Sequence, residues 1–326
     1  MSFSLSRRAA IAAAAALLVP AFATAEDYPS RPIKLLIGYT PGGAGDAVAR
    51  LLAAKYTEAL GQPATVENRP GASATLAATA VARATPDGYT LLVNTGPDST
   101  IGPLTMRKLP YSVPTDFSPI SLLTVVPSVL IVPANSPYQT VADVVKAARD
   151  NPGKLNYGSF GNGSSAHMSA ELFKSLTRTD ISHIPFKGSA PAMTDLLGGR
   201  IDILFDTFAS AWPQIQAGKV RALGVTSAER VPLAPSIPTM QEAGVADFIS
   251  QAFIGVTAPA NTPRSVIERL GEVTARIMAM PDVRERVVNL GMVPSPLKPE
   301  AYAAFLRSET NRNRRLITDA KLQFDN

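Results

Sequence analysis

Short apolar runs rich in β-branched residues alternate with helical patterns along most of this 326-residue chain. Such alternation is typical of βαβ units, in which helices cover the faces of a parallel sheet. The alternation is interrupted between residues 95 and 119, a stretch that contains five prolines, and then resumes. The sequence therefore predicts two α/β lobes.

The C-terminal helical patterns, from residue 263 onward, follow the second series of strands and need a sheet to cover. The first lobe still has an uncovered face, so we expect both ends of the mature chain to build it. This division gives lobe 1 as residues 26–124 plus 252–326, with residues 125–251 inserted as lobe 2. Two segments would then cross between the lobes and act as a hinge, and the cleft between them would be the place for a small-molecule site. Two independent α/β domains in series are the alternative.

The first 25 residues have the pattern of a secretory signal. Arg7 and Arg8 precede an apolar run, which ends in the small residues Ala23-Thr24-Ala25. Two arginines also occur in twin-arginine signals, but the downstream pattern of that class is missing, so we expect the ordinary Sec route. The expected compartment is the periplasm, where the mature chain would diffuse freely because no cysteine is present to carry a lipid anchor.

Composition excludes several kinds of site. The chain has no cysteine and two histidines, with no close acidic pair, so we expect neither a metal site nor a cofactor. The formal charge is +5, and the one basic cluster, at residues 312–315, fits a solvated helix face. Nucleic acid is therefore not an expected partner.

A glycine-rich loop at residues 39–46 joins the first strand to the first helix. Glycines allow the backbone to approach a ligand, and the free N–H groups at the start of a helix favour an anion. Asp46 could instead cap its own helix. The candidate ligand-binding residues here are Tyr39, Thr40, Gly42, Gly43 and Asp46.

A second glycine-rich loop, at residues 159–167, has the same strand-to-helix position in the other lobe. Its hydroxyl groups could complete the coordination of a carboxylate. Its candidate residues are Ser159, Gly161, Asn162, Gly163, Ser164, Ser165 and His167. A structural role is the alternative for His167. Of the two loops, we expect the second, which carries the hydroxyl groups, to be the main anchor for the ligand.

Other strand ends supply further candidates. Phe186 could contact an apolar ligand stem, and Lys187 could add charge attraction, although an exposed lysine is the alternative. Asp206 and Thr95 follow strands in the two lobes, where strand ends face a cleft.

The second loop also raises two enzymatic interpretations. No serine lies in a G-x-S-x-G pattern, so a hydrolase has no motif support. The run Gly161-x-Gly163-x-x-Ala166 formally matches the dinucleotide fingerprint, with Asp180 about 20 residues onward. A nicotinamide-dependent oxidoreductase is therefore the rival function, although an export signal argues against it.

Ordered motifs along nearly the whole mature chain resemble the substrate-binding proteins of tripartite tricarboxylate transporters, the Bordetella uptake gene or TctC-like receptors. These motifs are Tyr28-Pro29-x-Arg31-Pro32-Ile33, Pro41-Gly42-Gly43-x-x-Asp46, Glu67-Asn68-Arg69-Pro70-Gly71-Ala72, Pro86-Asp87-Gly88-Tyr89-Thr90-Leu91-Leu92, Tyr157-Gly158-Ser159 through His167, and Pro185-Phe186-Lys187-Gly188.

The resemblance implies a two-lobed periplasmic-binding-protein fold of type II, the Venus-flytrap class, and no enzymatic activity. It further implies a receptor that hands a small carboxylate, such as a di- or tricarboxylate, an amino acid or an aromatic acid, to membrane permease subunits. In the family, the loop matching residues 159–167 holds one ligand carboxylate and the loop matching 39–46 closes over it. Gly38 and Phe186 depart from the family's usual proline and tyrosine, which makes a less polar acid a plausible ligand. We expect a monomer, and a sensor subunit that presents its ligand to a signalling partner is a further alternative.

Overall fold

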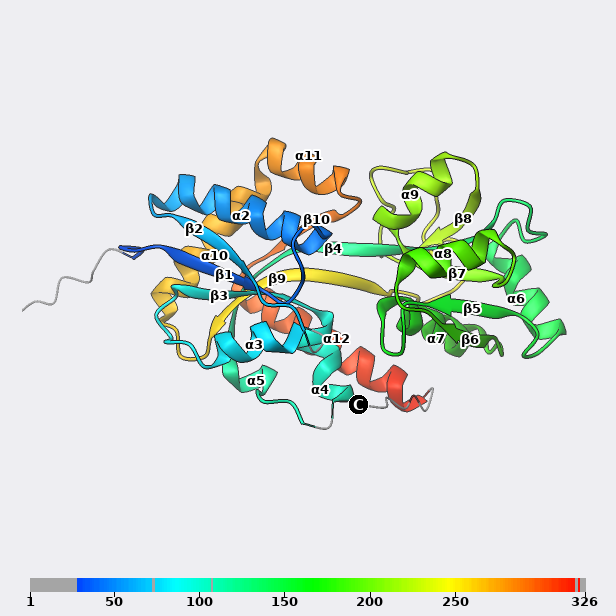
Figure 1. The fold of residues 1–326 in the computed structure, drawn as a ribbon, viewed down its shortest axis with the longest axis horizontal. Coiled ribbons are helices and arrows are strands. Elements are labelled where there is room, and N and C mark those ends of the chain that lie inside the picture. Colours follow the sequence, from blue (N-terminus) through cyan, green and yellow to red (C-terminus); the bar gives the residue numbers. More distant parts are fainter. Residues whose placement is uncertain (1–27, 72–73, 107, 320–321, 323–326) are drawn as a thin grey trace, which may run out of the picture.

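Two groups of strands, each covered by helices, are joined by two long strands, β4 (Phe117–Pro133) and β9 (Gln251–Pro259) (Figure 1). The computed structural model describes residues 28–71, 74–106, 108–319 and 322. The segment predicted as a signal peptide lies outside these residues. Within them, no helix is both long enough and apolar enough to cross a membrane.

The first lobe is built on strands from three parts of the chain. Across its sheet the order is β2 (Ala64–Asn68), β1 (Ile33–Ile37), β3 (Thr90–Thr95), β9 and the first half of β4, with β10 (Val293–Leu297) also paired to β4. The strands β2, β1 and β3 are parallel, whereas β9, β4 and β10 pair antiparallel.

Helices cover both faces of this sheet because its strands bury apolar side chains on both sides. Ile33, Leu35 and Ile37 share a core with the helices of one face, α2 (Ala44–Leu60), α10 (Arg264–Ala279) and α11 (Pro281–Asn289). On the other face Leu36 packs against α3 (Thr75–Ala82), and Phe253 packs against α12 (Pro299–Asp319). The C-terminal helices thus lie on the sheet that the N-terminal strands begin.

The second lobe repeats this sandwich with residues from the middle of the chain. Its strands are the second half of β4, then β7 (Ile203–Thr207), β5 (Asn156–Ser159) and β6 (Ser182–Pro185), with β8 (Val220–Val225) also paired to β4. One face carries α6 (Val141–Asp150) and α7 (Ser165–Thr177), and the other carries α8 (Ser189–Leu197) and α9 (Phe208–Gln216).

The sequence missed several features of the crossing region. The strand β4 crosses from one lobe to the other without interruption, and its pairing passes from β9 at Pro127 to β7 at Ser128. Between residues 95 and 119 the chain forms three short helices, η2 (Pro97–Ile101, π-helical), α4 (Gly102–Thr105) and α5 (Val113–Asp116). The expected parallel pairing is found within each lobe, whereas the strands that cross between the lobes pair antiparallel. The lobe boundaries at 124/125 and 251/252 stay a prediction.

The lobes also meet at two places away from these strands. The last turns of α12 reach α7 of the second lobe (Figure 1). On another side, Gly291, which follows α11, lies so close to Ala209 of α9 that a Cβ on the glycine would be 3.0 Å from the Ala209 Cα. The region between the lobes is therefore bounded by the two crossing strands and these two contacts.

Candidate functional site

The first glycine-rich loop is held in shape by its own acidic residue. The Gly42 N–H donates to Asp46 Oδ2 at 3.0 Å, and Asn68 Nδ2 donates to Asp46 Oδ1 at 2.8 Å. Arg50 Nε donates to the same carboxylate at 2.9 Å. The bond from Arg50, assisted by that from Gly42 and opposed by burial, lowers the pKa of Asp46 to about 2. The Asp46 carboxylate is therefore committed to the loop, and Asp46 does not line the cavity described below.

The second glycine-rich loop is likewise internally bonded. Ser164 Oγ accepts from the His167 N–H at 3.3 Å and caps α7, while His167 Nδ1 accepts from the Gly163 N–H at 3.0 Å. Ser159 Oγ forms a 2.6 Å hydrogen bond with His183 Nε2. Two glycines, Gly161 and Gly163, have positive φ values of 110° and 74°, which allow the loop to turn this tightly.

The two histidines form a stack with Tyr157 under this loop. The His167 and His183 ring centroids are 4.3 Å apart, and those of His183 and Tyr157 are 4.8 Å apart. Burial, followed by the neighbouring His167, lowers the pKa of His183 to about 4, and burial also lowers that of His167. Both rings are therefore neutral at ordinary pH. The structure thus places His167 in the packed support of the loop, in line with the alternative role.

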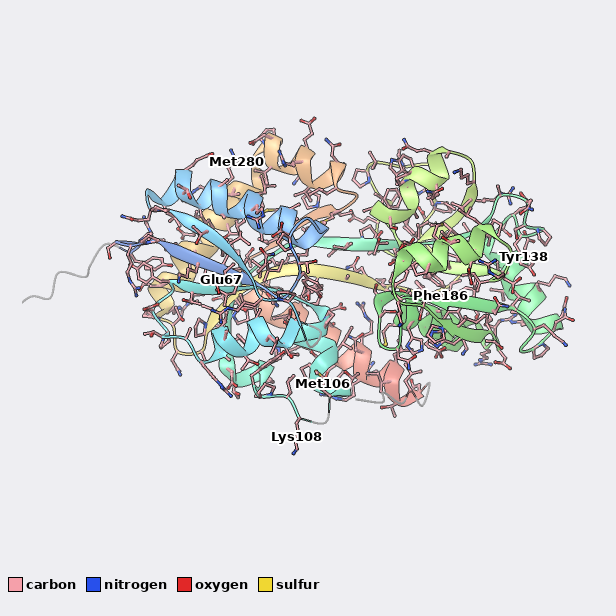
Figure 2. The ribbon with its side chains drawn as sticks, in the orientation of Figure 1. Glu67, Met106, Lys108, Tyr138, Phe186 and Met280 are labelled. Carbon is pink, nitrogen blue, oxygen red and sulfur yellow. The ribbon has the colours of Figure 1, made fainter. Side chains whose placement is uncertain are left out.

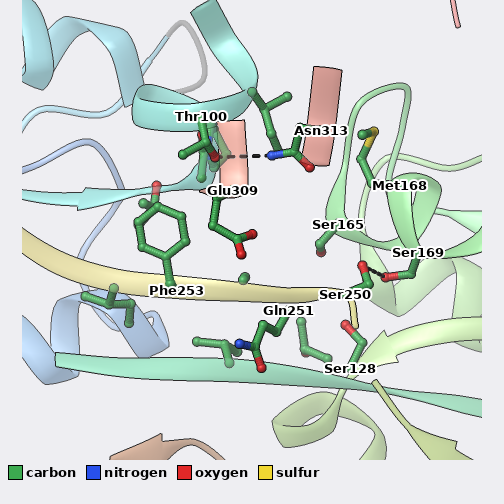
Figure 3. Close-up of a pocket in the computed structure, with 18 of the residues that line it drawn as sticks. Thr100, Ser128, Ser165, Met168, Ser169, Ser250, Gln251, Phe253, Glu309 and Asn313 are labelled. Atoms are coloured by element: carbon green, nitrogen blue, oxygen red, sulfur yellow. Dashed lines mark hydrogen bonds between the residues drawn. The ribbon is translucent and has the colours of Figure 1, made fainter. Parts of the chain in front are cut away.

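Between the lobes lies a cavity of about 400 Å³ that touches both loops (Figure 3). From the predicted set it brings together Tyr39, Thr40, Gly43, Thr95 and Ser165. Gly43 is the N-cap of α2, and Ser165 is the first residue of α7, so both helix N-termini reach the cavity wall. The free N–H groups at such ends favour an anion.

Other predicted residues lie elsewhere. Gly42 lines a separate pocket beside α9 and α11. Asp206 is buried and accepts hydrogen bonds from Ser189 Oγ at 2.8 Å and from the Thr207 N–H at 2.7 Å, and burial raises its pKa. Phe186, labelled in Figure 2, is half-buried and packs against the second lobe's own core, and Lys187 is exposed. The residues outside the cavity lining are Gly42, Asp46, Ser159, Gly161, Asn162, Gly163, Ser164, His167, Phe186, Lys187 and Asp206.

The sequence missed several groups of lining residues, among them those of the crossing strands and of helix α12. The crossing strands contribute Ser128 and Gln251, which the expected hinge segments could have indicated. Helix α12 contributes Glu309, Arg312 and Asn313, as Figure 3 shows for the first and last of these. No local signal marks them, because α12 looks like an ordinary covering helix in the sequence.

The cavity has a neutral polar part, an apolar part and one ion pair. Apolar side chains are contributed by Met168, Leu172, Val126, Phe253, Ile254, Ile249, Ile101 and Leu316. Of the described lining residues, Glu309 and Arg312 carry the charges, and Arg312 Nη2 donates to both carboxylate oxygens of Glu309. Burial raises the Glu309 pKa, against the opposite effect of Arg312. No group of residues suited to hold a metal ion occurs in the part of the chain that the structure describes.

The match of a family model decides the family. The model described as the tripartite tricarboxylate transporter family receptor matches residues 48–322. The chain belongs to this family. A Pseudomonas relative, the UPF0065 protein in the tcbD-tcbE intergenic region, is 41% identical over 297 residues, which cover 90% of this receptor and 88% of the relative. Protein BugT of Bordetella pertussis is 32% identical over 92% of this receptor and 93% of its own length.

Solved structures share the fold. The Rhodopseudomonas palustris protein Rpa4515, solved with adipate, aligns with a TM-score of 0.78 at 33% identity, covering 92% of this receptor and all of that chain. A Polaromonas TctC solute-binding protein without ligand gives 0.80 at 30% identity, covering 90% and 100%. MatC of R. palustris, solved with malate, gives 0.72 at 32% identity, covering 89% and 100%. The predicted two-lobed periplasmic-binding-protein fold is therefore confirmed, and the family is one of periplasmic transport receptors.

Proposed function

We propose that this receptor binds a small carboxylate with an apolar stem in the cavity between its lobes. The observation that carries the proposal is that the N-termini of α2 and α7, one from each lobe, both contribute to the lining of the same cavity. Backbone N–H groups and neutral hydroxyls there suit a carboxylate without a dedicated arginine. The apolar lining beside them suits a hydrocarbon stem, as in the adipate bound by Rpa4515.

The same proposal covers the receptor's cellular role. The chain is exported through the Sec route, works in the periplasm as a monomer, closes lobe 2 (125–251) onto lobe 1 (26–124 and 252–326), and delivers its ligand to membrane permease subunits. The family assignment and the likeness to periplasmic receptors support this role.

The rival dinucleotide site gains no support. Neither Gly161 nor Gly163 lines the cavity, and the Gly163 N–H, which a pyrophosphate would need, already donates to His167 Nδ1. We therefore propose that the chain is a binding protein without enzymatic activity.

A thermal-shift screen tests the carboxylate function. The panel contains C4 to C6 dicarboxylates, citrate, monocarboxylates and aromatic acids, each compared with its uncharged amide. A true ligand at 100 times its Kd should add about 2.7 kcal/mol to the free energy of unfolding, and its amide should add nothing. A panel in which no acid shifts the midpoint, or in which amides match their acids, would contradict the proposal.

A further inference from the structure

A buried acid lies directly behind the cavity wall. Asp98, in the π-helical turn η2, is 1% exposed. Its carboxylate accepts from the Thr95 N–H at 2.9 and 3.1 Å, from Thr95 Oγ1 at 3.1 Å and from Ser99 Oγ at 2.6 Å. No lysine, arginine or histidine is bonded to it among the described residues. The titratable groups that face it are Tyr39 after β1, Tyr111 before α5 and Tyr302 of α12.

A hydrogen-bond chain joins this acid to the cavity. Thr95 Oγ1 is 3.0 Å from the Tyr39 hydroxyl oxygen, and both residues line the cavity, whereas Asp98 does not. Burial, then the nearby Asp98, raises the pKa of Tyr39 to about 12. The Tyr39 hydroxyl therefore keeps its proton near neutral pH and acts as a hydrogen-bond donor, either to Thr95 or to a group in the cavity.

The protons available in this hydrogen-bond chain determine whether the Tyr39 hydroxyl can donate to a ligand or only accept from it. Thr95 has one hydroxyl proton, and while Asp98 is ionised this proton goes to the carboxylate. Tyr39 must then donate to Thr95 Oγ1, because two oxygens 3.0 Å apart share one proton. Only lone pairs of the Tyr39 oxygen remain for the cavity, and these repel a carboxylate.

Protonation of Asp98 reverses every bond in the chain. The acid then donates to Thr95 Oγ1, Thr95 donates to Tyr39, and the Tyr39 proton becomes available to a ligand. Protonation of the other carboxylate oxygen, Oδ1, offers no such path. Ser99 Oγ donates its proton to Oδ1 and already accepts from Asn94 Nδ2 at 2.8 Å, so a proton on Oδ1 would leave the Ser99 hydroxyl without its acceptor.

We propose that Asp98 is a positioning residue that sets whether Tyr39 donates or accepts in the cavity, so that a carboxylate bound at Tyr39 draws one proton from solvent onto Asp98. This inference rests on the proposed carboxylate function and adds to it the uptake of one proton by Asp98 when the ligand binds. Burial, opposed by the bonds from Ser99 and Thr95, raises the pKa of Asp98 to about 7, so the proton is within reach near neutral pH. The receptor should accordingly favour acids over ligands that offer a hydroxyl or amine to Tyr39.

Isothermal titration calorimetry tests the linkage with the acid that binds best among adipate, malate and benzoate. Heats measured at pH 7.5 in phosphate and in Tris, which differ in ionisation enthalpy, give the number of protons taken up. Wild-type protein should take up a fraction of a proton, approaching one at higher pH. Its affinity should fall by up to about tenfold per pH unit above neutrality, because the protonated form is the binding form.

Four variants locate the proton. Asp98→Asn, whose amide can donate to Thr95, should bind without proton uptake and with an affinity independent of pH between 7 and 9. Thr95→Val should also abolish the uptake, and Thr95→Ser should restore it. Glu309→Gln should keep it. Uptake that persists in Asp98→Asn, or that disappears in Glu309→Gln, would assign the proton to another group and overturn the inference.

A measurement without ligand separates this inference from the proposed function. Carbon-13 NMR of the side-chain carboxyl groups, with Asp98 assigned by the signal lost in Asp98→Asn, should show a midpoint near neutrality that Thr95→Val shifts. A midpoint below about pH 5, near the ordinary range for aspartate, would overturn the inference even if acids bind. If Asp98 titrates with a midpoint near neutrality but no acid binds, the hydrogen-bond chain is supported. In that case a carboxylate is not the ligand, and the proposed function fails.

Discussion

Asp46 is a charged residue of the first glycine-rich loop whose hydrogen bonds hold that loop in shape. Its carboxylate accepts from Gly42, Asn68 and Arg50, and it does not line the cavity. The loop that presents Tyr39 and Gly43 is thereby fixed before any ligand arrives. Preorganisation of this kind lowers the entropic cost of binding.

Replacing this carboxylate should change how stability depends on pH. The folded-state pKa of Asp46 is about 2, below the ordinary value of 3.8, so the ionised form stabilises the fold. This contribution is present above about pH 4 and is lost as the pH falls toward 2. We expect Asp46→Asn to lose about 1–2 kcal/mol at pH 7, a figure discounted because Arg50 is half exposed, and less at pH 3.

Urea unfolding at both pH values measures this difference. Asp87→Asn is the matched control, since Asp87 pairs with Arg31 at the surface and such pairs contribute little. Equal losses for Asp46→Asn at pH 7 and pH 3 would show that the carboxylate charge is not what stabilises the loop.

At the scale of elements, the start of α7 divides two roles between adjacent residues. Ser164 is the N-cap and uses its hydroxyl to accept from His167, whereas Ser165, the next residue, lines the cavity. Successive residues of a helix point about 100° apart, so one cannot take the place of the other. Only the second is in position to contact a ligand.

The two serines should therefore respond differently to alanine. Ser164→Ala should lower the unfolding free energy by about 1 kcal/mol through loss of the cap and change ligand affinity little. Ser165→Ala should leave stability nearly unchanged and weaken binding by about 1 kcal/mol, the usual value of one hydrogen bond. Chemical denaturation and calorimetry on the same samples compare them. The reverse pattern would place the ligand on Ser164.

At the scale of the whole molecule, the lobes touch where Gly291 packs against Ala209. Gly291 has a φ of 72° and follows the end of α11, while Ala209 belongs to the second lobe. This contact lies outside the cavity between the lobes, although it borders a neighbouring pocket that Gly42 and Gly43 also line. It can report on lobe closure separately from ligand contacts.

A larger side chain at this contact should hold the lobes apart. We expect Ala209→Leu to increase the radius of gyration of the liganded protein in small-angle X-ray scattering and to weaken binding severalfold. Ala217→Leu, on the exposed end of the same helix, is the control. If Ala209→Leu binds as tightly as wild type and closes to the same dimensions, closure does not depend on this contact.

The sequence alone determined the α/β class, most helices and the two glycine-rich loops, because apolar periodicity and glycine placement are local signals. Helix α6, for example, runs from Val141 to Asp150, and a capping box between Thr140 and Asp143, two residues close in sequence, marks its start. Tertiary structure decided which loop residues reach the cavity. Ser159, Ser164 and Asp46 looked like ligand groups, yet each has its partner inside the protein.

The contributions of α12 and of Asp98 could be recognised only from the tertiary structure. The cavity wall and the hydrogen-bond chain to which they belong form between residues far apart in the sequence. Glu309 reaches a site whose other walls come from residues 39–254. Asp98 acquires its importance from burial behind Thr95 and Tyr39, which no local pattern records. Periodicity reveals which face of an element is buried, whereas only packing determines what that face meets.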